Sequence, residues 1–151
     1  MKKKQGEKAD KRLPAARRRE VILDAATDVF MESGYDGAHM DIIAERAGVT
    51  KPILYRHFRS KLELLLAVID REGKELIRSI SRPRDETIDW KTSIALDVKA
   101  YLDFVEGRRA GFIMLYSQGI DIAREVAERI AAIRGEVGEI IAEHVRFYTD
   151  T

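Results

Sequence analysis

Apolar side chains recur at intervals of three and four residues in the first part of the chain, which is the spacing of amphipathic helices. The pattern predicts helices over residues 17–34, 40–48 and 51–58. Gly34 and Gly48 stand at the ends of the first two helices, where glycine is common because it adopts left-handed backbone geometry without strain.

A capping box predicts where a longer fourth helix begins. Ser60 stands three residues before Glu63, and the two side chains are expected to satisfy each other's unpaired backbone N–H groups. Apolar residues then recur to position 80. Pro83 ends this pattern, and residues 81–85 are expected to form a linker.

Helical spacing continues in the second half of the chain, over residues 94–105, 112–116 and 122–145. No stretch alternates with the two-residue period of a β-strand, and no internal repeat is found. The predicted fold class is therefore all-α.

Composition and charge limit the partners. The chain has 151 residues, 45% of them hydrophobic, and it lacks cysteine, which excludes disulfides and thiolate zinc sites. Residues 1–61 hold 14 Lys and Arg against 9 Asp and Glu, whereas residues 62–151 hold 13 against 17. A basic first part favours contact with a polyanion, although a solvated basic tail explains the same charges.

The segment between the second and third predicted helices has the residues of a helix-turn-helix. Gly48 can turn the chain sharply, and Val49 is expected to fill the angle between the helices. Thr50 is the predicted N-cap of the third helix, and Pro52 is tolerated in its first turn.

The third predicted helix has an apolar side and a cationic side. Leu54 and Phe58 lie one turn apart and are expected to face the core. The opposite face has almost no carboxylate and suits a DNA major groove, where Arg binds guanine and apolar groups meet thymine methyls. A solvated surface helix can have the same composition, but the turn and the basic flank favour DNA. This face consists of Lys51, Pro52, Ile53, Tyr55 and Arg56.

A set of residues between positions 17 and 69 has a tight spacing and covers about a third of the chain. The set is Ile22, Ala25, Ala26, Phe30, Gly34, Tyr35, Ile43, Ala44, Ala47, Gly48, Val49, Thr50, Lys51, Leu54, Tyr55, His57, Phe58, Ser60 and Lys61. In these positions the chain resembles the DNA-binding domain of the TetR family of bacterial transcriptional regulators.

The resemblance implies a homodimer that reads a palindromic operator in double-stranded DNA, each subunit placing its third helix in the major groove. Carried over by position, the base-reading residues would be Lys51, Pro52, Ile53 and Arg56. The phosphate contacts would be Thr50, Tyr55, His57 and Lys61. Where the family usually has Thr or Ser at the start of the second helix, this chain has Ala38 and His39. His39 either donates to a phosphate in their place or caps the helix.

The family also implies a regulatory domain with a small-molecule pocket. The candidate pocket residues are Tyr101, Phe104, Phe112, Met114 and Tyr116. Plain core packing is the more common role for any one of them. Gly135 and Gly138 lie inside the last predicted helix, which favours close packing against another helix or a ligand. The stretch from Gly48 to Asp70 resembles actinobacterial members that sense long-chain fatty acyl-CoA, which suggests that effector class.

The expected organisation has four segments. They are a disordered basic arm at 1–13, a helix-turn-helix domain at 14–60, a connecting helix and linker at 61–84, and a helical regulatory domain at 85–151. Members of the family usually continue for several more helices, of which the last two form the dimer contact. The regulatory domain is therefore expected to be truncated or to dimerise in another way.

The function expected from these residues is that of a sequence-specific repressor released from, or modulated on, its operator by a small apolar ligand. An enzyme is disfavoured, because His39, His57 and His144 are far apart and no phosphate loop or nucleophile elbow is present. No cofactor or metal is expected. A cytoplasmic location is expected, since no apolar run is long enough to span a membrane. The alternative is a helical ligand-binding or interaction module whose helix-turn-helix no longer reads DNA.

Overall fold

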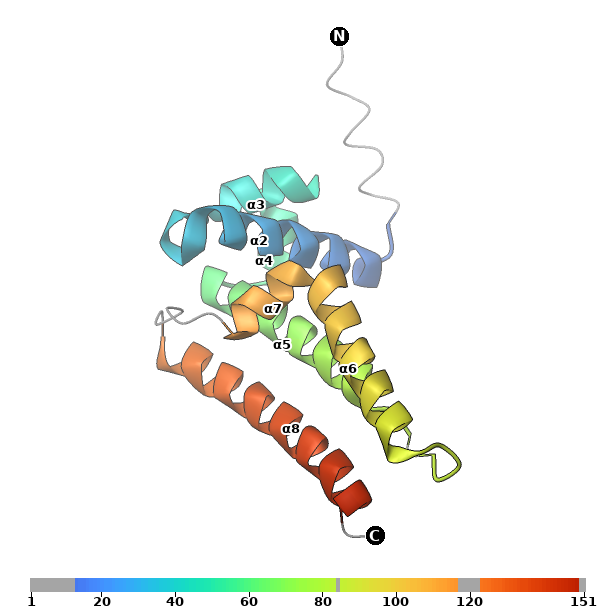
Figure 1. Ribbon diagram of the computed structural model, residues 1–151. Helices are drawn as coiled ribbons and strands as arrows, with labels where there is room; N and C mark the ends of the chain where they lie inside the picture. Colours follow the sequence, from blue (N-terminus) through green and yellow to red (C-terminus); the bar gives the residue numbers. More distant parts are fainter. Residues whose placement is uncertain (1–12, 84, 117–122, 150–151) are drawn as a thin grey trace. The chain divides into compact units, whose positions relative to one another are not determined.

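The computed structural model describes residues 13–83, 85–116 and 123–149, and within these ranges the chain forms seven helices and no strand (Figure 1). This confirms the all-α prediction. None of these helices is long and apolar enough to cross a membrane. The helices are α2 (Ala15–Gly37), α3 (Met40–Ala47), α4 (Lys51–His57), α5 (Lys61–Ile80), α6 (Trp90–Gly107), α7 (Arg109–Tyr116) and α8 (Arg124–Thr149).

The internal contacts divide the chain into two compact units, residues 1–68 and residues 69–151. The expected boundaries after residues 13, 60 and 84 remain predictions. Apart from Leu13, the expected basic arm at 1–13 lies outside the described residues.

The first unit is built on α2, which buries one apolar face. Ile22, Ala26 and Phe30 are buried there at the spacing that predicted the helix. Gly34 has φ 68° and ψ −179°, so the regular helix ends at this residue as predicted, and a further helical turn continues to Gly37. Only a residue without a side chain adopts this geometry readily.

The start of α5 uses the predicted capping residues with one difference. The Glu63 backbone N–H donates to Ser60 Oγ at 3.1 Å, as expected of a capping box. The Glu63 carboxylate, however, accepts the N–H of Arg59 at 2.9 Å. The prediction that it returns to Ser60 is therefore wrong by one residue, because the chain bends at residues 59 and 60 and the N–H of Arg59 is the one that meets the carboxylate.

The second unit contains an ion pair with a buried carboxylate. Glu72 on α5 is only 2% exposed, and its two carboxylate oxygens accept from Arg108 Nε and Nη2, both at 2.7 Å. Arg71 Nε also donates to this carboxylate, at 3.1 Å. Gly111 on α7 packs against it so closely that an added Cβ would lie 2.2 Å from Glu72 Oε2. This pair therefore fixes α5 against the α6–α7 corner.

The glycines of α8 do not pack as the sequence suggested. A Cβ added at Gly135 or Gly138 would meet no atom within 4 Å among the described residues. The expectation of close helix packing there is wrong, whereas Gly138 lines a groove and can still meet a ligand. Close packing occurs instead at Gly111 and at Gly73, where Ile133 of α8 fills the space.

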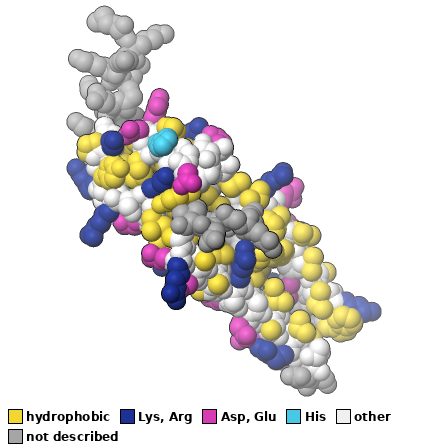
Figure 2. Space-filling model, turned by 90° about the vertical axis from the view of Figure 1, so that its left-hand side faces the viewer, with side chains coloured by type: hydrophobic (Ala, Val, Ile, Leu, Met, Phe, Trp, Pro, Cys, Tyr) yellow, Lys and Arg dark blue, Asp and Glu magenta, His cyan; other side chains and the backbone are white. Residues whose placement is uncertain are grey.

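Helix α6 leaves part of its apolar surface open. Trp90 is 54% exposed, Val98 51% and Leu102 56%, and on α8 Val145 is 50% exposed. Figure 2 shows one face of the molecule, on which hydrophobic side chains remain at the surface between charged groups of both signs. Exposed apolar side chains that gather in this way often mark a binding surface.

Candidate nucleic-acid interface

The helix-turn-helix has the geometry that its glycine predicts. Gly48 adopts a left-handed conformation with φ 67°. The Val49 N–H donates to Ala44 O at 3.0 Å and the Gly48 N–H to Glu45 O at 3.1 Å, which together close α3 in a Schellman motif. Val49 is buried in the angle between α3 and α4, as expected.

Helix α4 is anchored by two buried residues and exposes the opposite side. Leu54 is fully buried and Phe58 is 1% exposed, which confirms the predicted inward pair. The guanidinium of Arg19 also lies over the Phe58 ring, 5.0 Å from its centroid. On the other side Lys51, Pro52, Tyr55 and Arg56 are exposed, and Ile53 is half-buried.

One exposed cation of α4 already has a partner. Lys51 Nζ lies 2.8 Å from Asp41 Oδ1, in the first turn of α3. The hydrogen bond to Asp41, and then the charge of this carboxylate, raise the pKa of Lys51. Any DNA contact by Lys51 therefore competes with Asp41, a carboxylate that the sequence analysis did not connect with this helix.

A shallow hollow of about 420 Å³ collects residues from both ends of the helix-turn-helix. His39, Lys51, Tyr55 and Lys61, all predicted DNA contacts, line it together. Arg59 and Ser60 line it as well. Arg59 was not among the predicted contacts, although it follows α4 directly in a basic stretch.

Lys61 is held in place by the end of α2. Its Nζ donates to the backbone oxygen of Tyr35 at 2.7 Å and lies 4.3 Å from the centroid of the Tyr35 ring. The ammonium group has three donors, so this bond leaves donors that can reach a phosphate oxygen.

The remaining predicted contacts differ in their surroundings. His39 and Thr50 are the N-cap residues of α3 and α4, but neither side chain accepts a capping hydrogen bond. His39 therefore occupies the N-cap position without a side-chain cap bond, its side chain is exposed, and the phosphate contact stays a prediction. His57 is half-buried, and desolvation, followed by the charges of Arg18, Arg19 and Arg56, lowers its pKa.

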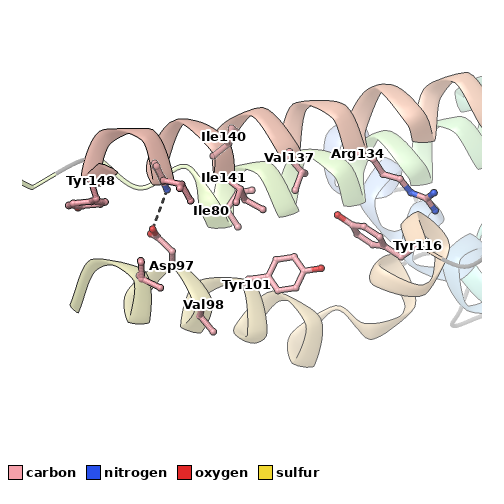
Figure 3. Close-up of a pocket in the computed structure, with 14 residues that line it drawn as sticks. Ile80, Asp97, Val98, Tyr101, Tyr116, Arg134, Val137, Ile140, Ile141 and Tyr148 are labelled. Carbon is pink, nitrogen blue, oxygen red and sulfur yellow. Dashed lines mark ion pairs between the residues drawn. The ribbon is translucent and has the colours of Figure 1, made fainter. Parts of the chain in front are cut away.

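The candidate ligand pocket lies in the second unit. Only two of the five residues predicted for it line the groove that the structure shows there. A groove of about 560 Å³ between α6 and α8 is lined by Tyr101 and Tyr116 (Figure 3). Phe104 and Met114 are buried in the core and lie outside this lining. Phe112 is also outside it, but its ring stacks on Tyr116 with centroids 4.9 Å apart.

Most of the groove wall was not predicted as a pocket. The aliphatic side chains of Ile94, Val98 and Val137 contribute to it, and so do Arg134 and the Asp97–His144 pair. Ile94, Val98 and Val137 belong to helical faces that the periodicity did identify, whereas the charged residues do not. The periodicity could not show whether such a face meets the core or an open groove.

Comparison with known proteins decides the family. Residues 22–68 match the model of the bacterial regulatory proteins of the tetR family, and residues 91–151 match a tetracyclin repressor-like C-terminal domain. The chain belongs to the TetR family. This confirms the resemblance in the helix-turn-helix and extends it to the second half of the chain.

Individual relatives place the chain among transcriptional regulators. It is 38% identical, over 83% of its length, to the transcriptional activator FasR of Mycolicibacterium smegmatis, of which it spans 57%. The structure of a TetR-like regulator from Rhodococcus sp. RHA1 superposes with a TM-score of 0.77 and 31% identity, covering 92% of this chain and 75% of that one. FadR of Bacillus subtilis, solved in complex with stearoyl-CoA, shares the fold with a TM-score of 0.69 and 22% identity, covering 83% and 67%.

Proposed function

We propose that this protein is a sequence-specific DNA-binding regulator that reads its operator with α4. The observation that carries the proposal is that this helix has one face buried in the core and an opposite face that is exposed and cationic. Leu54 and Phe58 fix it in the core, and Lys51 and Arg56 are exposed on the side that faces away. A short helix presenting Arg on a rigid support is suited to hydrogen bonding with guanine in the major groove.

We assign base reading to Lys51, Pro52, Ile53 and Arg56. Arg56 is the principal residue of this set, because its guanidinium can form two parallel hydrogen bonds with one guanine. Lys51 can contact a base only after it breaks its ion pair with Asp41, whose Oδ1 lies 2.8 Å from Lys51 Nζ. The carboxylate also repels phosphate, which disfavours non-specific binding.

We assign the phosphate contacts to residues around the 420 Å³ hollow and at the two ends of α4. Their side chains are polar or cationic, and most are exposed, as phosphate contacts require. Arg59 joins the set because it lines the same hollow. The set is His39, Thr50, Tyr55, His57, Arg59 and Lys61.

The proposed regulator acts in the cytoplasm as a homodimer on a palindromic operator and responds to a small apolar effector. A ligand that prefers the non-binding conformation lowers DNA affinity by the ratio of its affinities for the two states. The groove between α6 and α8 supports such a ligand by its volume of about 560 Å³ and its aliphatic wall. A fatty acyl-CoA is a candidate effector, given the stearoyl-CoA complex of a protein with the same fold. We propose that the regulator represses transcription from its operator rather than activating it.

The test is a binding selection on randomised duplexes with the wild-type protein and Arg56→Ala at the same salt concentration. We expect Arg56→Ala to relax preference at two symmetric base pairs, by about 1–3 kcal/mol each. Folding should be unaffected, because an exposed helical position tolerates alanine. Arg124→Ala is the matched control, since this arginine is also exposed and helical but belongs to the second unit.

Two results would contradict the proposal. Identical preference profiles for wild type and Arg56→Ala would move base reading away from Arg56, to Lys51 and Ile53. Absence of any sequence preference in the wild type would support the alternative, a helical module whose helix-turn-helix no longer reads DNA.

A further inference from the structure

The two flanks of α4 face different parts of the first unit. Tyr55 and His57 differ by about 200° around the helix axis and lie on opposite sides of the buried face. Tyr55 borders the hollow of about 420 Å³, whereas His57 is not part of its lining. At the end of α4 the Phe58 ring meets α2, whose Arg19 guanidinium lies 5.0 Å from the ring centroid. The His57 flank therefore borders the N-terminal part of α2.

Two arginines of α2 continue the side of the helix that is buried further along. Ile22 and Leu23 are fully buried. Arg18 and Arg19 each stand four residues earlier, so they lie on the same side of α2, one turn closer to its N-terminus. The side of α2 that is apolar in the core is thus cationic where it reaches the end of α4.

The position of Arg19 leaves it able to bind an anion. Its contact with the Phe58 ring attracts the cation to the face of the π system and occupies no oxygen acceptor. A guanidinium has five N–H donors in a fixed planar arrangement, which matches the oxygens of a phosphate. Arg19 is exposed, while Phe58 below it is only 1% exposed and rigidly packed. The charge is therefore held at a defined place beside α4.

His57 lies in positive surroundings. It is the last residue of α4 and is half-buried. Desolvation, followed by the charges of Arg18, Arg19 and Arg56, lowers its pKa. Glu63 at the start of α5 accepts a backbone N–H and is not among these causes. Within the described part of the chain, all the charges that shift the pKa of His57 are therefore positive, and a negative group at this point would relieve their repulsion.

We propose that Arg19 and His57 form an anion site on this flank of α4, and that a backbone phosphate of bound DNA enters it together with a proton, which His57 takes up. The phosphate accepts hydrogen bonds from the guanidinium and from the protonated imidazole. Arg18 adds positive charge from the same side of α2. The inference deepens the proposed function and rests on it, because it makes DNA binding depend on pH.

DNA binding should strengthen as the pH falls. In the free protein the pKa of His57 lies below its ordinary value of 6.5, so the imidazole is largely neutral at neutral pH. A phosphate beside it favours the charged form and raises this pKa in the complex. Affinity should therefore rise as the pH falls from the pKa of the complex to that of the free protein, and level off below the latter. The slope of log affinity against pH can reach about one per subunit in this window.

The first measurement is the number of protons taken up on binding. The full chain is titrated calorimetrically with a duplex of arbitrary sequence, because phosphate contacts do not depend on sequence. Buffers of different ionisation enthalpy at one salt concentration give the proton count. We expect uptake of about 0.5 proton per subunit or more near pH 6.5, and most of it should be lost in His57→Gln. Circular dichroism at each pH verifies that the chain is folded.

The second measurement assigns the proton to one residue. The chain has three histidines, so a variant with both His39→Gln and His144→Gln retains His57 alone. Its imidazole signal is titrated by nuclear magnetic resonance with and without the duplex. We expect the pKa of His57 to be below 6.5 in the free protein and to rise in the complex.

Variants of α2 test the arginine. Arg19→Ala should lower the slope of log affinity against log salt by about one unit per subunit and reduce the proton uptake, because no guanidinium then holds the phosphate beside His57. Arg19→Lys keeps the charge and should restore most of the slope. Arg17→Ala is the matched control, since this exposed arginine lies on the same helix but about 200° from Arg19 around its axis, and both quantities should stay unchanged.

The inference is overturned if the pKa of His57 is the same with and without DNA, if His57→Gln takes up as many protons as the wild type, or if Arg19→Ala behaves as Arg17→Ala. If duplexes bind with this proton uptake but without sequence preference, base reading by α4 is wrong and the inference stands. If binding is sequence-specific without uptake at His57, the proposed function stands and the inference is wrong. A folded chain that binds no duplex refutes both.

Discussion

Gly111→Ala is expected to destabilise the second unit, although the same substitution usually stabilises a helix. In a helix interior, alanine is favoured over glycine by about 1 kcal/mol. At position 111 the new Cβ would lie 2.2 Å from Glu72 Oε2 and 2.6 Å from Glu72 Cδ, so the carboxylate must move. Moving it breaks its two hydrogen bonds of 2.7 Å with Arg108, at a side chain that is 2% exposed.

The magnitude follows from these opposing terms. Breaking a fully buried ion pair costs about 3–5 kcal/mol, and less is expected here because Arg108 is 35% exposed and Arg71 also donates to Glu72. Because the helix propensity of alanine returns about 1 kcal/mol, the net loss in the free energy of unfolding should be about 1–3 kcal/mol. Gly135→Ala is the matched control, because a Cβ there meets no described atom within 4 Å, and it should stabilise α8 by about 0.5–1 kcal/mol.

The assay is urea unfolding followed by far-ultraviolet circular dichroism. A second comparison isolates the contact: in a Glu72→Ala background the space is free, and Gly111→Ala should then stabilise the protein or have no effect. The reasoning is refuted if Gly111→Ala stabilises the wild-type protein as much as Gly135→Ala does, or if its cost is the same with and without the Glu72 carboxylate.

Two further predictions concern the DNA-binding unit. Lys61→Ala should weaken binding to all duplexes alike and lower the slope of log affinity against log salt by about one unit, and an unchanged slope would remove Lys61 from the phosphate contacts. The lowered pKa of His57 means that the unfolded chain binds this proton more tightly, so stability should fall as pH drops through 6.5. Thermal melts of His57→Gln should show a weaker dependence between pH 7 and 5 than the wild type, and equal profiles would contradict this.

Local features of the fold could be predicted from the sequence because they depend on neighbouring residues. The spacing of Leu54 and Phe58 indicated which side of α4 is buried, and Gly48 indicated the turn before it. Both follow from the helical repeat and from the backbone freedom of glycine. The proposed DNA-facing surface is exposed because it is the remaining side of a short helix.

Features that join distant positions could not be predicted. Lys61 bonds to Tyr35 across 26 positions, and Arg108 bonds to Glu72 across 36. No local pattern encodes which charged side chains meet after the helices pack. The glycines show the same limit, because composition indicated that glycine is unusual in a helix but not that Gly111 is the one that packs tightly.

The bond between Lys61 and Tyr35 has a thermodynamic consequence for DNA binding. A free lysine side chain loses rotamer entropy worth about 1.5–2 kcal/mol when it is immobilised. Lys61 is already held by a carbonyl at 2.7 Å and by the face of an aromatic ring before any DNA is present. Much of that entropy is therefore lost during folding, and a phosphate that meets this ammonium finds it in place. Lys61 should consequently contribute more to the lifetime of the complex than a mobile surface lysine of equal charge.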